Sequence, residues 1–366
     1  MNATAAVFRR LVGGALWLGG LGGLSYALTR AVLPRDPLPP VTGPHPVGTS
    51  VAVVEAPRRL PVQIWYPGQA TGGPNPAGTP AALFPASAGV AQAIASHYGM
   101  PRGVAPALGL VLGRIRGRAV GSATPAWPSG SLPTPRGVLI ISHGWLGFRV
   151  IHVDLAEQLA SDGWVVVAVD HVGGALASQF PDHAVTPLSA GLMPPDGVAD
   201  YWPRAAALVQ RYATDIAAVL DAVAAGRLGP TVPATERFWL LGHSTGGGAA
   251  IVVAGEDRRV AGVIGMDPWV EPLDRSARQR LTVPTIAILS GQWVGNRNDA
   301  LLQMMGSVEL RAVPEARHTD LTVLGYLSPV RRILGLTRCD PALPRRAALK
   351  AVADLTNLAV AKAGID

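Results

Sequence analysis

One stretch of the sequence, "LLGHSTGGGAA" at residues 240–250, places a serine between glycines, after apolar residues and before small ones. A serine hydroxyl is a poor nucleophile until a neighbouring base takes its proton. Gly242 and Gly246 lack Cβ atoms, so a strand before Ser244 and a helix after it can approach closely. The start of that helix would direct its free N–H groups at the serine and favour an oxyanion there. The stretch therefore predicts that Ser244 is a catalytic nucleophile on a sharp strand-to-helix turn.

The base that activates Ser244 is expected to be a histidine. In hydrolases with such a turn, the order along the chain is serine, acid, histidine. Of the eight histidines only His318, in "PEARHTD", follows Ser244, and it lies just past the last strand-like run. His143 and His243 are expected to be structural residues near the site.

Two aspartates are candidates for the acid that orients this histidine. Asp267, in "GMDPWVEPL", directly follows a strand-like run, and Asp299, in "GQWVGNRNDA", comes well after the next one. A strand tip would hold Asp267 rigidly, whereas many hydrolases of this kind place the acid after the later strand. Asp320, two residues from His318, is poorly placed to support the imidazole. The residues alone leave Asp267 and Asp299 open.

An oxyanion formed at Ser244 requires two backbone N–H donors. The first is expected from Thr245, directly after the nucleophile, and the second from the loop that follows the third strand. That loop is "SHGWLGFR" at residues 142–149, in which Trp145 is expected to supply the N–H group.

These residues need a sheet that brings them to one edge. The later strand-like runs are short and continuously apolar, which is typical of parallel strands buried on both faces. Helical segments at 153–161, 204–225, 244–255 and 345–363 separate or follow them. We therefore predict a mostly parallel, eight-stranded α/β sheet with helices on both faces. The eight runs are 51–56, 60–67, 137–142, 164–169, 237–241, 260–266, 284–290 and 308–313.

Two long insertions interrupt the alternation. Residues 68–136 contain two apolar stretches, 88–98 and 104–120, that are expected to be helices of a lid-like segment. The second stretch ends in Arg114, Arg116 and Arg118, which predicts contact with a lipid surface or a lid role. Residues 173–203 are expected to form a long loop.

The first 33 residues differ from the rest of the chain. Two arginines precede eighteen uncharged residues, "LVGGALWLGGLGGLSYAL", as in an export signal or a membrane anchor. The proline-rich residues 34–48 are expected to form a linker, and residues 49–366 a catalytic domain with its insertion at 68–136. This arrangement predicts a protein that is exported or membrane-anchored.

Composition excludes several classes of function. The net charge is +7, but the one tight basic group, "GRIRGR", is too short for a nucleic-acid surface. Cys339 is the single cysteine, so no intrachain disulfide forms, and no zinc motif or P-loop occurs. We expect neither a metal nor a cofactor, and no oligomeric state follows from the sequence.

Taken together, four stretches resemble the platelet-activating-factor acetylhydrolase family, including its bacterial lipase-like relatives. They are "IISHGWLGFRVIHVDLAEQLASDGWVVVAVDH", "LLGHSTGGG", "VIGMDPWVEPL" and "PEARHTDL". The resemblance runs from about residue 51 to the C-terminus and implies an α/β-hydrolase fold. It also implies that Ser244, Asp267 and His318 are the catalytic residues, which favours Asp267 over Asp299.

The activity that this resemblance implies is a cofactor-free serine esterase or lipase acting on short or oxidised acyl esters of phospholipids. The stretch "GHSTGGG" is also similar to bacterial cutinase-like polyester hydrolases, so a carboxylesterase for soluble or polymeric esters is the alternative. A non-catalytic binding module with a hydrolase fold is a more remote alternative, against which the order of Ser244, Asp267 and His318 argues.

Overall fold

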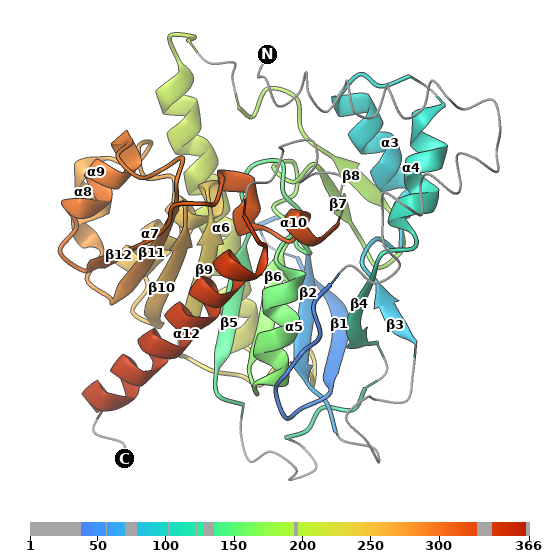
Figure 1. Ribbon diagram of the computed structural model, residues 1–366, viewed down its shortest axis with the longest axis horizontal. Coiled ribbons are helices and arrows are strands. Elements are labelled where there is room, and N and C mark those ends of the chain that lie inside the picture. Colours follow the sequence, from blue (N-terminus) through green and yellow to red (C-terminus); the bar gives the residue numbers. More distant parts are fainter. Residues whose placement is uncertain are drawn as a thin grey trace.

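The computed structural model describes residues 38–55, 57–69, 79–101, 103–121, 123–127, 135–193, 197–327 and 339–363. A twisted ten-stranded sheet runs through the centre of the molecule (Figure 1). Its strand order is β12-β11-β10-β9-β5-β6-β2-β1-β4-β3. The strands are β1 (Val47–Val54), β2 (Leu60–Pro67), β3 (Pro80–Ala82), β4 (Arg116–Val120), β5 (Val138–Ser142), β6 (Val165–Val169), β9 (Phe238–His243), β10 (Val260–Met266), β11 (Thr285–Ser290) and β12 (Val308–Val313).

Six neighbouring strands, from β6 through β5, β9, β10 and β11 to β12, are parallel. The register aligns their carboxyl ends, since Ser142 of β5 pairs with Gly242 of β9, and Met266 of β10 pairs with His243. Residues that follow β5, β9 and β10 therefore meet at one edge of the sheet. Beyond β6, strand β2 joins the sheet antiparallel to both β6 and β1.

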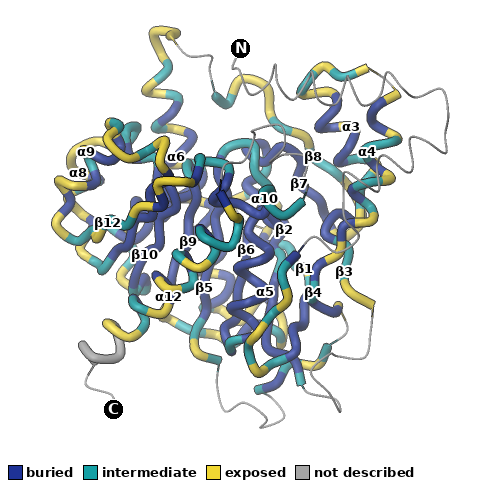
Figure 2. Tube along the Cα trace, viewed as in Figure 1, coloured by how far each residue is buried: buried dark blue, intermediate teal, exposed yellow. Residues whose placement is uncertain are grey.

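Helices cover both faces of the sheet and produce two hydrophobic cores (Figures 1 and 2). The α5 and α12 side chains pack on one face against residues such as Leu139 and Ile264, while α6 and α7 pack on the other against Ile140 and Val263. Such strands are apolar on both sides, as the sequence predicts. The helices are α3 (Ser87–His97), α4 (Val104–Leu112), α5 (Val153–Ser161), α6 (Tyr201–Ala224), α7 (Thr245–Glu256), α8 (Arg275–Arg280), α9 (Arg297–Gln303), η1 (His318–Leu321), α10 (Leu324–Leu327) and α12 (Ala342–Ala363).

All eight predicted strands are present, and the predicted α/β class is confirmed. The predicted number of strands is wrong because the insertion supplies β3 and β4, which extend the edge next to β1. The stretch 104–120 is likewise not one helix. The α4 helix ends at Leu112, and β4 follows, in which exposed Arg116 and buried Gly117 alternate as in a strand.

The segment 173–203, predicted to be a loop, contains a small antiparallel pair, β7 (Ala177–Gln179) and β8 (Val185–Pro187). The α3 helix packs on both strands, so this pair supports the α3–α4 part of the insertion (Figure 1). Within the described residues no helix is long and apolar enough to cross a membrane. The predicted signal or anchor at residues 1–33 lies outside the described part of the chain.

Candidate active site

Ser244 lies on the predicted turn between β9 and α7, with backbone angles φ 54° and ψ −120°. L-residues rarely adopt a positive φ, so the surrounding contacts must hold this conformation. The Ser244 N–H group donates to the Met266 carbonyl at 2.9 Å. A Cβ atom on Gly242 would collide with the Gly246 carbonyl, and one on Gly246 with the Ser142 carbonyl. The glycines therefore permit the close strand–helix approach that presents the serine.

Asp267 and His318 are brought together from positions 51 residues apart, with 2.8 Å between Asp267 Oδ2 and His318 Nδ1. Asp267 is fully buried and accepts two more hydrogen bonds, from the Ser290 N–H at 2.7 Å and the Ser290 hydroxyl at 2.6 Å. Because a carboxylate can only accept, the proton between them lies on Nδ1 of His318. The other ring nitrogen, Nε2, is then the one available to accept a proton.

The His318 ring lies between two other rings. Trp293 stacks on it at 5.2 Å and an interplanar angle of 8°, and His243 stacks at 4.5 Å and 29°. The backbone is fixed as well, because His318 N–H donates to Gln292 Oε1 at 2.8 Å and His243 Nε2 donates to the His318 carbonyl at 3.2 Å. The imidazole is thus held on both faces and through its own peptide groups.

Ser244 and His318 share these neighbours without a direct hydrogen bond between their side chains in the described structure. His243 precedes Ser244 in the chain and stacks on the His318 imidazole. Met266 accepts a hydrogen bond from the Ser244 N–H, and the next residue, Asp267, binds the imidazole. Hydrogen bonds of this kind are often long in ligand-free enzymes and tighten when substrate binds.

The predicted oxyanion donors lie beside the serine. Gly144 is so close that a Cβ there would be 2.9 Å from the Ser244 Cβ, so the loop after β5 passes directly over the turn. Among the described residues nothing accepts a hydrogen bond from the backbone N–H of Trp145 or Thr245. Both N–H groups are therefore available to a ligand atom.

The competing aspartates serve other contacts. Asp299 is buried at the start of α9, where its carboxylate accepts from the Gly295 N–H at 2.6 Å and from Gln303 Nε2 at 2.8 Å. Asp320 accepts from the Arg317 N–H at 2.8 Å within η1. The structure brings neither carboxylate to the ring nitrogens of His318.

Both histidines expected to be structural are buried. His143 donates from Nδ1 to the Gly144 carbonyl at 2.7 Å and accepts at Nε2 from the His171 N–H at 3.1 Å. Burial lowers the pKa of both His143 and His243 well below the usual value, so both rings are neutral. Each ring thus acts as a fixed hydrogen-bonding group.

Sequence reasoning missed Ser290, Gln292 and Trp293, all of which contact the Asp267–His318 pair. The stretch "SGQWVGN" contains them, directly after an apolar strand. The end of that strand at the same sheet edge is the signal that could have pointed to them.

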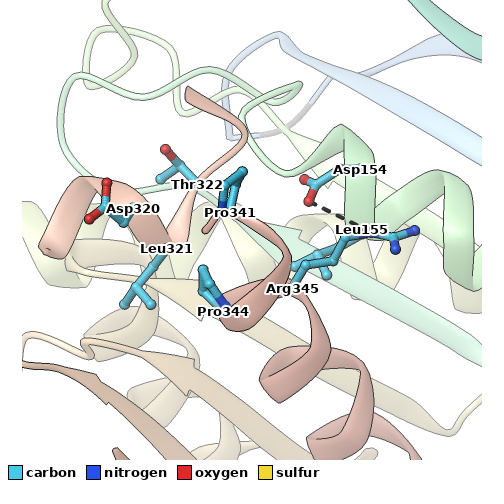
Figure 3. Close-up of a pocket in the computed structure, with 8 residues that line it drawn as sticks. All are labelled: Asp154, Leu155, Asp320, Leu321, Thr322, Pro341, Pro344 and Arg345. Carbon is cyan, nitrogen blue, oxygen red and sulfur yellow. Dashed lines mark ion pairs between the residues drawn. The ribbon is translucent and has the colours of Figure 1, made fainter. Parts of the chain in front are cut away.

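A small cavity of about 10 Å³ lies where α5, η1 and α12 meet (Figure 3). Arg345 from α12 approaches Asp154 of α5 there, with 4.0 Å between Nε and Oδ2. The volume suffices for about one water molecule, so the cavity is too small for an ester substrate. No cluster of three or more metal-binding side chains occurs in the described ranges.

Comparison with known proteins finds similarity to two family models and to one relative. The model described as "Platelet-activating factor acetylhydrolase, isoform II" matches residues 31–186, and "Serine aminopeptidase, S33" matches residues 133–304. Platelet-activating factor acetylhydrolase from Bos taurus is 25% identical over 256 residues. This alignment covers 59% of the chain and 57% of the relative, so the chain matches only part of the relative's length. The chain therefore resembles the acetylhydrolase-like α/β-hydrolases.

A solved structure agrees with this fold. A ferulic acid esterase from Streptomyces cinnamoneus superposes with a TM-score of 0.65 at 23% sequence identity. The match covers 87% of the present chain and 92% of the esterase. The predicted α/β-hydrolase fold is thereby confirmed.

Proposed function

We propose that the protein is a serine carboxylic-ester hydrolase in which Ser244, His318 and Asp267 form the catalytic triad. The observation that carries the proposal is the 2.8 Å hydrogen bond from His318 Nδ1 to the buried Asp267, beside a serine held at positive φ. An acid that fixes the histidine tautomer next to a strained serine is the arrangement that acyl transfer requires. The resemblance to an acetylhydrolase supports the same reaction class.

In this mechanism Ser244 Oγ attacks the ester carbonyl carbon while His318 Nε2 takes the hydroxyl proton. Asp267 holds the imidazole in the required tautomer and stabilises the imidazolium. The N–H groups of Trp145 and Thr245 donate to the oxyanion of the tetrahedral intermediate. His318 then protonates the leaving alcohol, and water, activated by the same base, releases the acid from Ser244.

The substrate class we propose is short or oxidised acyl esters of lipids, as the name of the Bos taurus relative suggests for that enzyme. Soluble or polymeric esters are the alternative, which the likeness of "GHSTGGG" to cutinase-like polyester hydrolases favours. The exposed apolar residue Leu110 on α4, next to Arg114, supports contact with a membrane surface. We further propose that residues 1–33 direct the protein out of the cytoplasm.

A panel of esters tests these proposals. The wild-type protein is assayed on p-nitrophenyl esters of increasing chain length and on phospholipids with acetyl or long acyl chains at one position. We expect turnover of p-nitrophenyl acetate and, among phospholipids, preference for the acetyl form. Preference for a polyester film over both would favour the alternative substrate class, and absence of turnover on every ester would refute the proposed reaction.

A further inference from the structure

A second serine–histidine–aspartate chain lies in the described core, apart from the proposed triad. Ser142 Oγ and His171 Nε2 are 2.8 Å apart, and His171 Nδ1 lies 3.0 Å from Asp215 Oδ2. All three side chains are at most 1% exposed. Arg58 completes the chain with an ion pair of 2.5 Å to the other Asp215 oxygen.

The direction of each hydrogen bond follows from the chemistry of the groups. The Asp215 carboxylate can only accept, so His171 carries its proton on Nδ1. Burial lowers the pKa of His171, and its ring stacks on Tyr212 at 3.7 Å. The neutral ring then accepts at Nε2, so the Ser142 hydroxyl donates its proton to His171. A buried serine at the end of β5 has no access to a substrate, which excludes nucleophilic catalysis by Ser142.

These buried hydrogen-bonded side chains contact both segments that carry the proposed oxyanion donors. A Cβ atom on Gly246, in the first turn of α7, would lie 2.6 Å from the Ser142 hydroxyl oxygen, so the hydroxyl packs directly on that turn. The His171 N–H donates to His143 Nε2 at 3.1 Å, and His143 Nδ1 donates to the Gly144 carbonyl at 2.7 Å. The His171 side chain is therefore linked through Ser142 to the turn that bears the Thr245 N–H group. Its backbone N–H is linked through His143 to the loop that bears the Trp145 N–H group.

The C-terminal end of the loop 142–149 is held by Asp170, the residue before His171. Asp170 accepts from the Arg149 N–H at 2.7 Å and from its guanidinium at 2.5 Å, and all of these groups are buried. Between the two ends, the Leu146 N–H donates to the Gly174 carbonyl at 3.2 Å. The loop 142–149 is thus fastened at both ends and in the middle to the segment after β6.

We propose that His171, held by Asp215 and bonded to Ser142, is a positioning residue that fixes the Trp145 and Thr245 N–H groups at the distance the oxyanion requires. This inference rests on the proposed serine-esterase function. The geometry fits the role because oxyanion stabilisation depends on donors that are held before reaction and do not reorganise during it. A displacement of about 1 Å at such a site costs on the order of 100-fold in rate.

The test measures kcat and KM for p-nitrophenyl acetate, and the melting temperature, on the full chain. We expect His171→Ala to lower kcat by about 100-fold while KM stays within about twofold, since donors to the transition state move while the substrate contacts remain. Ser142→Ala removes a single oxygen atom and should lower kcat by about 10-fold. If His171→Ala does not fold, the kcat of Ser142→Ala tests the inference instead.

The tautomer of His171 separates positioning from general stability. In Asp215→Asn the single amide oxygen stays with the Arg58 guanidinium, so the amide NH₂ group faces His171 Nδ1 and the ring carries its proton on Nε2. The ring can then no longer accept from Ser142, and kcat should fall by about 10-fold, as in Ser142→Ala. Asp215→Ala removes both carboxylate acceptors and should resemble His171→Ala. Val219→Ala, at a buried position on the same helix, is the stability control and should lower the melting temperature with kcat unchanged.

The inference would be overturned if His171→Ala or Ser142→Ala kept kcat within twofold of wild type. It would equally fail if Asp215→Asn kept kcat within twofold of wild type. Failure of the proposed function has a different signature, because the wild-type protein itself would then neither turn over the ester nor react with a fluorophosphonate at Ser244.

Discussion

At the scale of single residues, two members of the proposed triad have a positive φ, Ser244 at 54° and Asp267 at 43°. Such conformations cost about 1–3 kcal/mol each and persist only where neighbours determine them. Here the neighbouring strands do so: the Ser244 N–H donates to the Met266 carbonyl of β10, and the Asp267 N–H donates to the Ile288 carbonyl of β11 at 2.8 Å. The strain thus falls on the nucleophile and on the acid, which lie on adjacent strands.

The acid provides the first prediction at this scale. Asp267→Asn should leave the fold intact and lower kcat by roughly 10⁴-fold, because the amide presents the wrong imidazole tautomer. Asp299→Asn is the matched control, since that carboxylate accepts from Gly295 and Gln303 at its own helix, and it should change kcat by a few-fold at most. Steady-state hydrolysis of p-nitrophenyl acetate measures both. A severe loss in Asp299→Asn with a mild one in Asp267→Asn would assign the acid to the other strand.

Much of this site follows from the sequence, because the order of Ser244, Asp267 and His318 and their strand-tip positions are local features. The residues alone left Asp299 open as well as Asp267; the structure distinguishes them through contacts across 51 residues of chain. The support given by Ser290, Gln292 and Trp293 has no local pattern. It depends on how the segment after β11 turns back over η1.

At the scale of elements, Glu157 connects α5 to β4, the strand next to the sheet edge. Its Oε1 accepts from the Arg118 N–H at 2.7 Å and the Ala119 N–H at 3.0 Å. Burial outweighs these two hydrogen bonds and raises the pKa of Glu157 from 4.5 to about 7. The folded state therefore binds a proton that the unfolded state has released between these two pH values.

It follows that this interaction stabilises the fold at acidic pH and loses its contribution as pH rises from about 4.5 through about 7. Glu157→Gln keeps the accepting oxygen without the charge, so it should stabilise the protein at pH 8 by on the order of 2 kcal/mol, with little effect at pH 4.5. Urea unfolding at both pH values measures the difference. Burial also raises the pKa of Asp154, to about 6, so the stability of the variant should still fall somewhat as pH rises. Equal stability of variant and wild type at pH 8 would contradict the prediction.

The α4 helix provides the second prediction at the element scale. Its outer side exposes Pro106 and Leu110, and Arg114 and Arg116 follow it, both exposed. Arg118 instead donates to the Leu38 carbonyl, so it belongs to the fold rather than to this surface. Replacing Arg114 and Arg116 with glutamine should weaken binding to anionic vesicles at low salt, while hydrolysis of p-nitrophenyl acetate stays unchanged.

Vesicle co-sedimentation measures that binding. The double change Arg227→Gln and Arg346→Gln, at exposed positions elsewhere, removes the same net charge and should leave the binding intact. Equal binding by both double variants would exclude a specific role for the α4 surface.

The elements themselves were predictable where their hydrophobic pattern was long. All eight core strands and the four main helices follow from apolar runs and their spacing. The two strands beyond β1 were not predictable from the sequence, because β3 has three residues and β4 contains two arginines and a glycine. Their stability comes from pairing with β1 and from Glu157, contacts that a local pattern does not contain.

At the scale of the whole molecule, the described residues account for a complete α/β sheet covered on both faces. The charge pattern of residues 1–33 is that of an export signal or an anchor. We predict that full-length protein tagged at its C-terminus fractionates outside the cytoplasm. A variant lacking residues 1–33 is the control and should stay inside. Recovery of intact full-length protein in the cytoplasm would contradict the prediction.

The central claim, that one serine performs the chemistry, is tested by covalent labelling. A fluorophosphonate should react with the wild-type protein at one residue, Ser244, and peptide mass spectrometry should locate the adduct there. Ser244→Ala should abolish both the label and ester hydrolysis, with a fall in kcat of about 10⁴-fold or more and an unchanged melting temperature. Labelling or hydrolysis that survives in Ser244→Ala at the wild-type level would contradict the assignment of the nucleophile and, with it, the proposed function.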